Sequence, residues 1–420
     1  MDLRSLKVRS RRSRGVDPDT KPTHPDRASV VTLQPETMEV ASMKITRILR
    51  PGSFRAIQRK VSALVFLFFA LPAQAQHDPK LQQIAAFPDQ QVTGITVASD
   101  GRIFVNFPHW SDAHSVSVAQ LGENSALTPY PDSNWNSNEG PVDRRFICVQ
   151  SVVADDQDGL WVLDPASVKM EGVVSGGAKL VKIDLKTNKV IRDIVFPDSV
   201  APRKSYLNDV RIDTHNGFAF ITDSGIGGLV VVDLKSGQAR RVLQNHPSTK
   251  AEPPVVLVIE GVKLVDPKTG EPVQVHSDGI AYDKAGGFVY FQALAGRTLY
   301  RIPVPDLENV DLSDADLAKR IETVATVPAA DGLAFRNGSI YSTAIEQDAI
   351  VRLDLATKQF EVVTKDSRLK WPDTLSFGSD GSLYVTTSQI HLTPRFNHGV
   401  SKISEPFGVY RIPLASEEPR

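Results

Sequence analysis

Six polar residues stand at equivalent places in six similar segments of the chain, and three of them are carboxylates. When the segments are aligned on a shared strand-turn-strand pattern, they begin at Thr93, Gln150, Asn208, Asp278, Asp331 and Asp373. Carboxylate, amide and hydroxyl oxygens can hold a hard divalent cation, move a proton or bind a cationic ligand. If the fold brings these six positions together, they form a polar binding or catalytic site.

Each segment is predicted to form a β-hairpin. Val210 and Ile212 alternate with polar residues before the turn at 215–217, and Phe218 and Phe220 alternate after it; Gly217 supplies the positive φ of a tight turn. The segments begin 57, 58, 70, 53 and 42 residues apart, an interval typical of propeller blades, and most are followed by a second strand pair. The sequence therefore predicts an all-β fold, a six-bladed β-propeller with four-stranded antiparallel blades.

The six polar residues are predicted to line the channel of this propeller, because the innermost strand of each blade faces the axis. Three carboxylates in one narrow channel repel each other, so they take up protons or a cation neutralises them. Oxygen ligands of this kind suit Ca²⁺ or Mg²⁺ better than Zn²⁺. For Asp331 and Asp373 taken singly, capping of a turn is the alternative. His276, two residues before Asp278, joins the predicted channel residues as a proton carrier, with a solvent-facing histidine as the alternative.

Two insertions are predicted to lie near the channel. The long polar loop 122–146 can cover one mouth, with Trp135 either closing over a ligand or fixing the loop to the rim. Residues 246–274 lengthen the interval between the third and fourth blades and predict an extra hairpin at the rim.

The N-terminal region is predicted to lie outside the propeller. Residues 1–42 are expected to be either disordered or the product of a wrongly assigned upstream start codon. Residues 43–75 read as a secretory signal peptide, with basic residues, the apolar run Val61–Leu71 and an Ala-Gln-Ala site. Cleavage is expected between Ala75 and Gln76, which gives a secreted or periplasmic protein without a stable membrane anchor. Residues 76–420 then form the propeller.

The net charge and the single cysteine restrict the kinds of partner that the chain is expected to have. Residues 1–75 hold 14 Lys and Arg and 6 Asp and Glu, which leaves 34 basic and 43 acidic residues in the remaining chain, a net charge of about −9. Such a charge repels polyanions, so no nucleic-acid partner is expected. The single cysteine, Cys148, is expected to be a buried, inert thiol. We expect a monomer whose partner is a small organic ligand or substrate.

Several segments resemble the signature segments of the major royal jelly protein/yellow family. They include VQSVVADDQDGLWVLD, LNDVRIDTHNGFAFITDSGIGGLVVVDLKSGQARRV, HSDGIAYDKAGGFVYF and WPDTLSFGSDGSLYV. The resemblance runs from about Leu81 to Pro413 and implies an exported six-bladed propeller with a ligand channel. Some yellow-type members are linked to dopachrome conversion and others bind small amines or sterols, so the resemblance leaves enzyme and carrier open.

A more distant similarity is to the gluconolactonase and senescence-marker-protein lactonases, six-bladed propellers that hold a divalent metal. This similarity implies metal ligands at Gln150, Asn208 and Asp278, with Asp278 also catalytic. Thr93 stands where those enzymes carry a Glu, so one anionic ligand is missing.

Three functions fit these observations. The leading hypothesis is lactone hydrolysis with a divalent metal, in which Asp278 or Asp331 activates water. A non-catalytic binding protein for a small ligand is the first alternative. The second is a metal-free tautomerase of dopachrome-like compounds, in which a channel carboxylate moves a proton.

Overall fold

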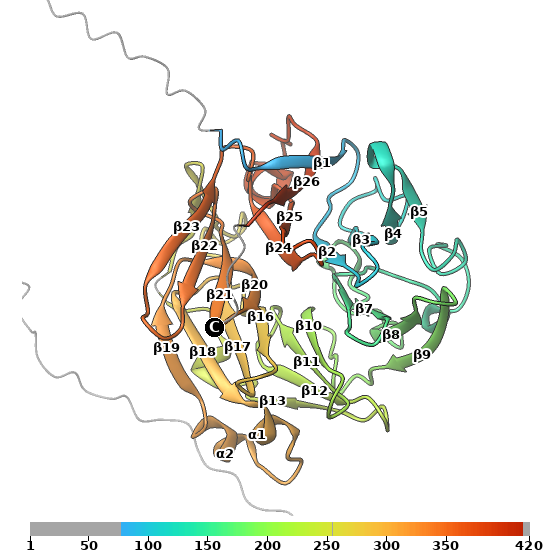
Figure 1. Ribbon diagram of the computed structural model, residues 1–420, viewed down its shortest axis with the longest axis vertical. Coiled ribbons are helices and arrows are strands. Elements are labelled where there is room, and N and C mark those ends of the chain that lie inside the picture. Colours follow the sequence, from blue (N-terminus) through green and yellow to red (C-terminus); the bar gives the residue numbers. More distant parts are fainter. Residues whose placement is uncertain (1–76, 254, 415–420) are drawn as a thin grey trace, which may run out of the picture. The chain divides into compact units, whose positions relative to one another are not determined.

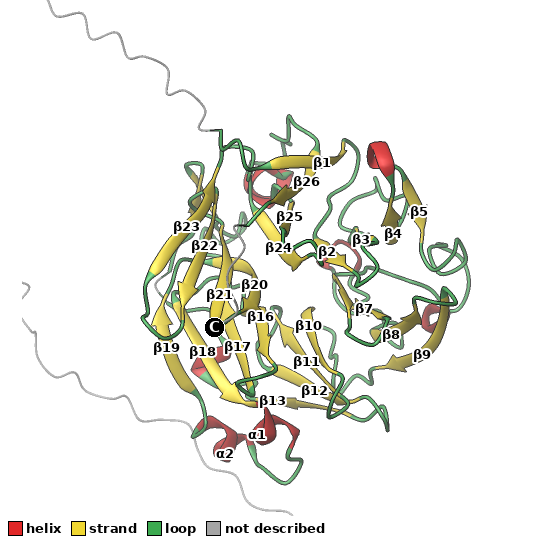
Figure 2. Ribbon diagram, viewed as in Figure 1, coloured by secondary structure: helices red, strands yellow, loops and turns green. Residues whose placement is uncertain are grey.

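The computed structural model describes residues 77–253 and 255–414. The predicted signal peptide and the segment before it lie outside these residues. The described part of the chain contains six four-stranded sheets and one two-stranded sheet, and all strand pairs within the four-stranded sheets are antiparallel. The sheets surround a central axis, with β10, β16, β20 and β24 nearest to it (Figures 1 and 2). The predicted six-bladed β-propeller is confirmed.

In the first five blades the strands follow one another in chain order from the axis outward. The first blade contains β2 (Gly94–Val97), β3 (Ile103–Asn106), β4 (Val118–Leu121) and β5 (Leu127–Pro129). The second contains β6 (Ser151–Ala154), β7 (Gly159–Asp164), β8 (Lys179–Asp184) and β9 (Lys189–Val195). The third contains β10 (Leu207–Asp213), β11 (Phe218–Asp223), β12 (Leu229–Asp233) and β13 (Ala239–Val242). The fourth contains β16 (Ser277–Asp283), β17 (Phe288–Ala293), β18 (Thr298–Pro303) and β19 (Glu322–Thr326). The fifth contains β20 (Ala330–Arg336), β21 (Ser339–Ala344), β22 (Ala349–Asp354) and β23 (Phe360–Lys365).

The sixth blade closes the ring with strands from both ends of the described chain. It contains β24 (Pro372–Phe377), β25 (Leu383–Thr387), β26 (Phe407–Ile412) and, at its outer edge, β1 (Gln82–Phe87). Phe87 of β1 pairs with Phe407 of β26. This arrangement satisfies backbone groups that an open ring would leave unpaired.

The innermost strands of four blades carry a register shift at the position of the polar residue. In β10, Leu207 pairs with Asp223 but Val210 pairs with Ile221, and β16, β20 and β24 shift in the same place. A bulge of this kind re-aims the side chain that it contains. A threonine hydroxyl on the second strand fills three of the bulges: Thr222, Thr343 and Thr386 accept hydrogen bonds from the backbone N–H groups of Asp209, Gly332 and Thr374.

The two Asp-Gly pairs at Asp278 and Asp331 lie within β16 and β20, not in turns. A Cβ atom on Gly279 would lie 2.5 Å from the backbone oxygen of Asp331, and one on Gly332 would collide with that of Asp373. Glycine is therefore required here by the close approach of neighbouring inner strands. The turn-capping alternative for Asp331 is wrong, because this residue lies inside a strand.

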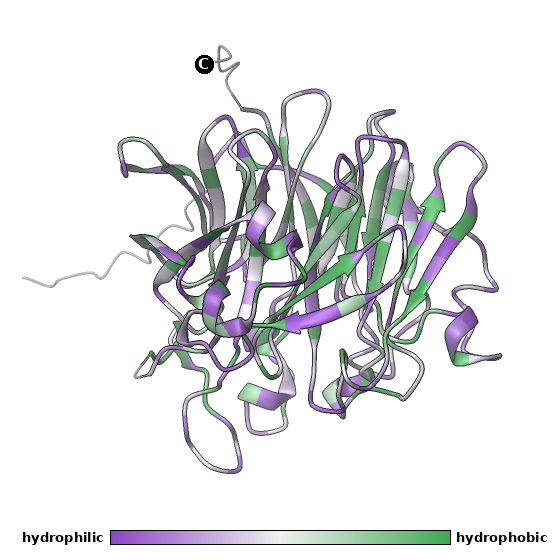
Figure 3. Ribbon diagram, turned by 90° about the horizontal axis from the view of Figure 1, so that it is seen from below, coloured by the Kyte–Doolittle hydropathy of each residue, from purple (hydrophilic) through white to green (hydrophobic). Residues whose placement is uncertain are grey.

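Apolar side chains fill the space between neighbouring blades. Leu180 and Ile194 of the second blade, for example, belong to the same buried cluster as Val210 and Ile221 of the third. Figure 3 shows apolar segments along the strands and hydrophilic residues in many connecting loops. Cys148 is fully buried, as expected, and burial raises its pKa to about 12.

Short helices and a two-stranded hairpin lie outside the six four-stranded sheets. The α-helices are α1 (Val304–Glu308) and α2 (Asp314–Ala318), and the 3₁₀-helices are η1 (Glu123–Ser125), η2 (Val142–Arg144), η3 (Val168–Met170), η4 (Pro247–Thr249), η5 (Ile390–Leu392) and η6 (Pro394–Phe396). The hairpin predicted between the third and fourth blades is present as β14 (Val258–Ile259) and β15 (Val262–Lys263). Within residues 77–253 and 255–414, no helix is long and apolar enough to span a membrane.

Candidate functional site

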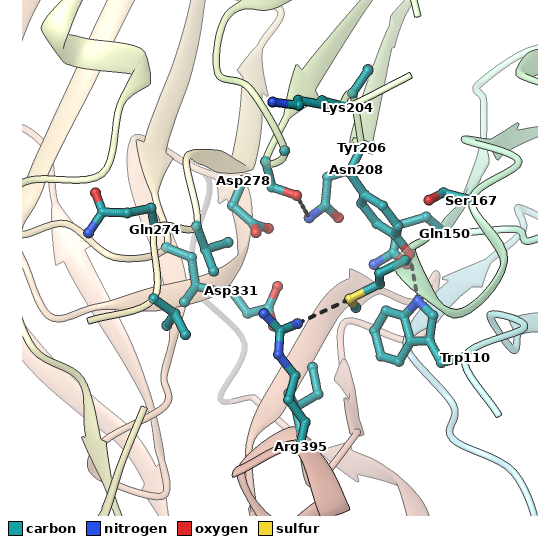
Figure 4. Close-up of a pocket in the computed structure, with 18 of the residues that line it drawn as sticks. Trp110, Gln150, Ser167, Lys204, Tyr206, Asn208, Gln274, Asp278, Asp331 and Arg395 are labelled. Atoms are coloured by element: carbon teal, nitrogen blue, oxygen red, sulfur yellow. Dashed lines mark hydrogen bonds between the residues drawn. The ribbon is translucent and has the colours of Figure 1, made fainter. Parts of the chain in front are cut away.

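A pocket of about 480 Å³ lies at the ends of the inner strands, and five of the six aligned polar residues line it (Figure 4). These are Gln150, Asn208, Asp278, Asp331 and Asp373. They come from five different blades, so the propeller brings together residues that are up to 223 positions apart in the sequence.

Two predicted channel residues are absent from the described lining of this pocket. Thr93 is fully buried, and its hydroxyl accepts a hydrogen bond from the side chain of Asn106 at 3.0 Å. His276 accepts a hydrogen bond through Nδ1 from the backbone of Ala251 at 3.0 Å, and burial together with the charge of Lys250 lowers its pKa. The structure therefore places both side chains in contacts that support the fold around the pocket.

Three buried carboxyl groups form the pocket floor. Burial and the neighbouring carboxyl of Asp331 raise the pKa of Asp278 well above its usual range, and the same two causes raise the pKa of Asp373. Asp278 Oδ1 has no hydrogen-bond partner, although it is fully shielded by the protein. The surroundings therefore favour the protonated forms of Asp278 and Asp373, and Asp278 has one oxygen without a hydrogen-bond partner in the described part of the protein.

Asp331 is the acid of the three that ionises most readily. Burial raises its pKa to about 6, while a hydrogen bond of 2.6 Å from Trp371 Nε1 and one from the carboxyl of Asp278 oppose the rise. Trp371 is itself held from behind: it stacks on His391 with ring centres 6.1 Å apart, and His391 Nε2 lies 2.8 Å from Glu260. At neutral pH Asp331 is thus mostly ionised, and it lies beside Asp278, whose protonated form its surroundings favour. Environments that separate two neighbouring pKa values in this way are typical of an acid–base pair.

The three predicted metal ligands differ in how free their oxygen atoms are. The Gln150 side-chain oxygen accepts a hydrogen bond of 2.9 Å from the Tyr206 hydroxyl, which in turn accepts one of 2.6 Å from Trp110 Nε1. The Asn208 amide nitrogen donates to Ser224 at 3.0 Å. Of the three predicted ligands, only Asn208 and Asp278 have a side-chain oxygen without a hydrogen-bond partner among the residues that the structure describes, and two protein oxygens are fewer than a tightly held Ca²⁺ or Mg²⁺ needs.

No group of three His, Cys, Asp or Glu side chains placed to hold a metal ion occurs in the described residues. The predicted divalent cation, Ca²⁺ or Mg²⁺ ahead of Zn²⁺, stays a prediction, and we derive no chemical step from it.

Aromatic and apolar side chains make the walls, and the sequence alone did not identify them. Trp110, Tyr206 and Trp371 line the pocket, as do Leu264 and Val273 of the insertion. Tyr206 and Trp371 each stand two residues before an aligned polar residue, a regularity that was available in the sequence.

Trp135, by contrast, does not reach the described pocket lining. It packs on Phe146, with ring centres 5.2 Å apart, and fixes its loop to the body of the propeller. Of the two alternatives for this residue, the structural one holds.

The mouth of the pocket carries basic side chains. Arg203, Lys204 and Arg395 line it and are exposed, and Glu171 lines it as well. Figure 4 shows Lys204 and Arg395 on opposite sides of the pocket, with Asp278 and Asp331 between them. The site thus combines an acid–base floor, apolar and aromatic walls and a basic mouth, an arrangement suited to binding a small amphiphilic molecule and transferring a proton.

Several solved structures are similar to this chain in fold. A luciferin-regenerating enzyme matches with 10% identity over 79% of this chain and 94% of its own, with a TM-score of 0.49. A gluconolactonase from Xanthomonas campestris matches with 11% identity over 79% and 89%, with a TM-score of 0.47. A calcium-binding regucalcin from Agrobacterium tumefaciens matches with 12% identity over 81% and 97%, also with a TM-score of 0.47. These similarities are too distant to carry an argument about chemistry.

Sequence comparisons give a family. No curated protein sequence matches the chain. The family model described as major royal jelly protein matches residues 147–410, which span the second to the sixth blade and include all five pocket-lining polar residues. The chain therefore belongs to the major royal jelly protein family.

Proposed function

We propose that the protein is exported, binds a small organic molecule in the axial pocket and transfers a proton on it, with Asp331 as the base and Asp278 as the acid. One observation carries the proposal: a fully buried carboxyl group with a free oxygen, Asp278, stands beside a carboxylate whose pKa is raised only to about 6. A base that titrates near 6 is ionised at neutral pH yet basic enough to accept a proton.

A dopachrome-type tautomerisation is the reaction class that these two groups serve best. The carbon–hydrogen bond next to a quinonoid ring breaks, its electron pair moves into the ring, and a ring carbonyl oxygen gains a proton. Asp331 takes the proton from carbon and Asp278 gives its proton to the oxygen. The proton then returns from Asp331 to Asp278 across their direct contact, so the pair is restored without another reactant.

The other two candidate functions require different groups in the pocket. Metal-assisted lactone hydrolysis needs a cation that polarises the carbonyl, and only two of the three predicted ligands have a free oxygen. A binding protein would use the same walls and floor without turnover, and the protonated Asp278 would donate a hydrogen bond to the ligand.

The test is a pH–rate profile with dopachrome, beside a panel of lactones, before and after treatment with EDTA. We expect loss of dopachrome to accelerate as the pH rises through about 6 and to be insensitive to EDTA. Asp331→Asn should lower the rate about 10²- to 10⁴-fold, as loss of a general base does. Equal rates for the wild type and Asp331→Asn would contradict the proposal. EDTA-sensitive lactone hydrolysis would establish the metal hydrolase instead, and binding without turnover of any compound would establish the binding protein.

A further inference from the structure

The mouth of the pocket holds three cations that the proton-transfer proposal does not use. Arg203, Lys204 and Arg395 all line the pocket, and among the described residues none of the three forms an ion pair with a carboxylate. Some exposed basic side chains elsewhere in the described chain form such pairs, as Lys169 does with Asp112 and Lys284 with Asp156. The feature of this site is that three basic side chains without a carboxylate partner in the described chain line the same pocket.

Arg395 is positioned across the opening. Its Nη1 lies 3.5 Å from Met170 Sδ, on a segment 225 residues away in the chain, and its guanidinium lies over the ring of Phe396 at 5.2 Å. Asp266 lies near enough to feel its charge but does not pair with it. Figure 4 shows the guanidinium turned toward the pocket interior. The guanidinium of Arg395 thus faces the entering ligand with N–H donors that other groups do not use.

The charge at the mouth gives the sign of the missing partner. Arg203, Lys204 and Arg395 contribute three positive charges and Glu171 contributes one negative charge, a balance of +2 (3 − 1). This balance favours an anionic ligand at the mouth.

We infer that the pocket selects small organic anions, carboxylates with an aromatic or apolar body, and that Arg395 and Lys204 bind the carboxylate at the mouth while the body reaches the floor. The inference rests on the proposed function, since it assigns the substrate class of the same site. Arginine and lysine suit the task because both bind carboxylates through charge-assisted hydrogen bonds. Apolar contact with Leu264 and Val273 then holds the body of the ligand.

The test compares two probes that differ only in charge, indole-2-carboxylate and indole-2-carboxamide, by calorimetric titration at low and high salt. We expect the carboxylate to bind the full chain at least about tenfold more tightly, which is about 1.4 kcal/mol, and salt to reduce the difference. Arg395→Gln and Lys204→Gln should each weaken binding of the carboxylate several-fold and leave the amide unchanged. The double variant should bind both probes equally. Lys189→Gln on the outer strand β9 is the matched control and should behave as the wild type.

Asp331→Asn separates this inference from the proposed function. That variant loses its base and should lose turnover, but it should keep the preference for the carboxylate, because both mouth cations remain. Equal affinity of the wild type for the two probes, no binding of either probe, or a double variant that still prefers the carboxylate would overturn the inference. Preference without any turnover in the wild type would uphold it and contradict only the proton-transfer reaction.

Discussion

Two groups of buried aspartates in this propeller have opposite surroundings. Asp223, at the end of β11, accepts hydrogen bonds from Ser205, from three backbone N–H groups and from Arg241. Asp164, at the end of β7, accepts three backbone N–H groups and pairs with the fully buried Lys179. On the pocket floor, Asp278 has an oxygen with no partner at all, and no cation pairs with it among the described residues.

The difference shows what each group is for. Asp223 and Asp164 accept hydrogen bonds from the backbone just before Asn208 and Gln150 and so hold these two pocket residues in place. The oxygens of both carboxylates have hydrogen-bond partners. Asp278 is in the pocket itself, where the fold of the described residues leaves one of its oxygens without a hydrogen-bond partner at a cost in stability. Polar groups that the fold does not satisfy are typical of functional sites. We therefore regard the first group as structural and the floor group as functional.

The largest expected effect comes from breaking a structural carboxylate. Asp223→Ala leaves Arg241, whose side chain is 7% exposed, without its ionic partner. We expect the free energy of unfolding to fall by about 3–5 kcal/mol, the usual cost of removing one member of a buried ion pair. Urea denaturation at pH 7 measures it, with Lys189→Gln as an exposed control. A loss below about 1 kcal/mol would erase the distinction between the two groups.

Titration of Asp331 should give the next largest effect. Its pKa is about 6 in the folded protein and about 3.9 when unfolded, so between these values the folded state holds the extra proton. The contribution of Asp331 to stability is therefore fully present below pH 4 and falls by up to about 3 kcal/mol as the pH rises to 6. The difference in stability between the wild type and Asp331→Asn across this range cancels the groups that Asp331 does not influence. A flat difference would mean that Asp331 titrates normally.

A smaller and opposite effect is expected for Asp278→Asn. The amide cannot ionise and can still donate a hydrogen bond to Asp331, so stability at pH 8 should be equal to or about 1–2 kcal/mol above that of the wild type. Turnover should be lost in the same variant. A marked loss of stability would show that Asp278 belongs with the structural carboxylates, and Asp223→Asn provides the matched comparison.

The smallest effect is expected from chelation. Because the Gln150 oxygen accepts a hydrogen bond from Tyr206 and the described residues contain no group of three His, Cys, Asp or Glu side chains that could hold a metal, EDTA should shift the melting temperature by less than about 1 °C, since only a ligand bound to the native state stabilises it. A larger fall in the melting temperature after EDTA that Ca²⁺, Mg²⁺ or Zn²⁺ reverses would support the metal hypothesis. Gln150→Leu serves as the variant in which one predicted ligand is absent.

The sequence was sufficient for the fold because the signals of a propeller are local. Alternating strands, Gly-containing turns and the spacing of the blades depend on neighbours in the chain, and so does the alignment that located Asn208, Asp278 and Asp331. The ring closure by β1 followed from the need to pair an edge strand.

The contacts among the pocket-wall residues could not be predicted for a physical reason, although the positions of Tyr206 and Trp371 two residues before an aligned polar residue were visible in the sequence. Trp110 and Tyr206 meet from different blades, and Trp371 contacts Asp331 across a blade boundary, so no local pattern encodes these contacts. Thr93 was expected at the channel because it matches the alignment, and His276 because it stands two residues before Asp278, but their side chains bond to Asn106 and Ala251. Alignment places a backbone position, whereas the neighbouring loops decide where its side chain points.

The protonation state of Asp278 is the most direct test of the account, because the acid–base pair depends on it. Infrared difference spectroscopy of the wild type against Asp278→Asn at pH 7 reports a protonated carboxyl group through its carbonyl stretch, without any substrate. The account predicts a carboxylic-acid band in the wild type that disappears in Asp278→Asn and persists in Asp223→Asn. A wild type in which Asp278 contributes only carboxylate bands would contradict it.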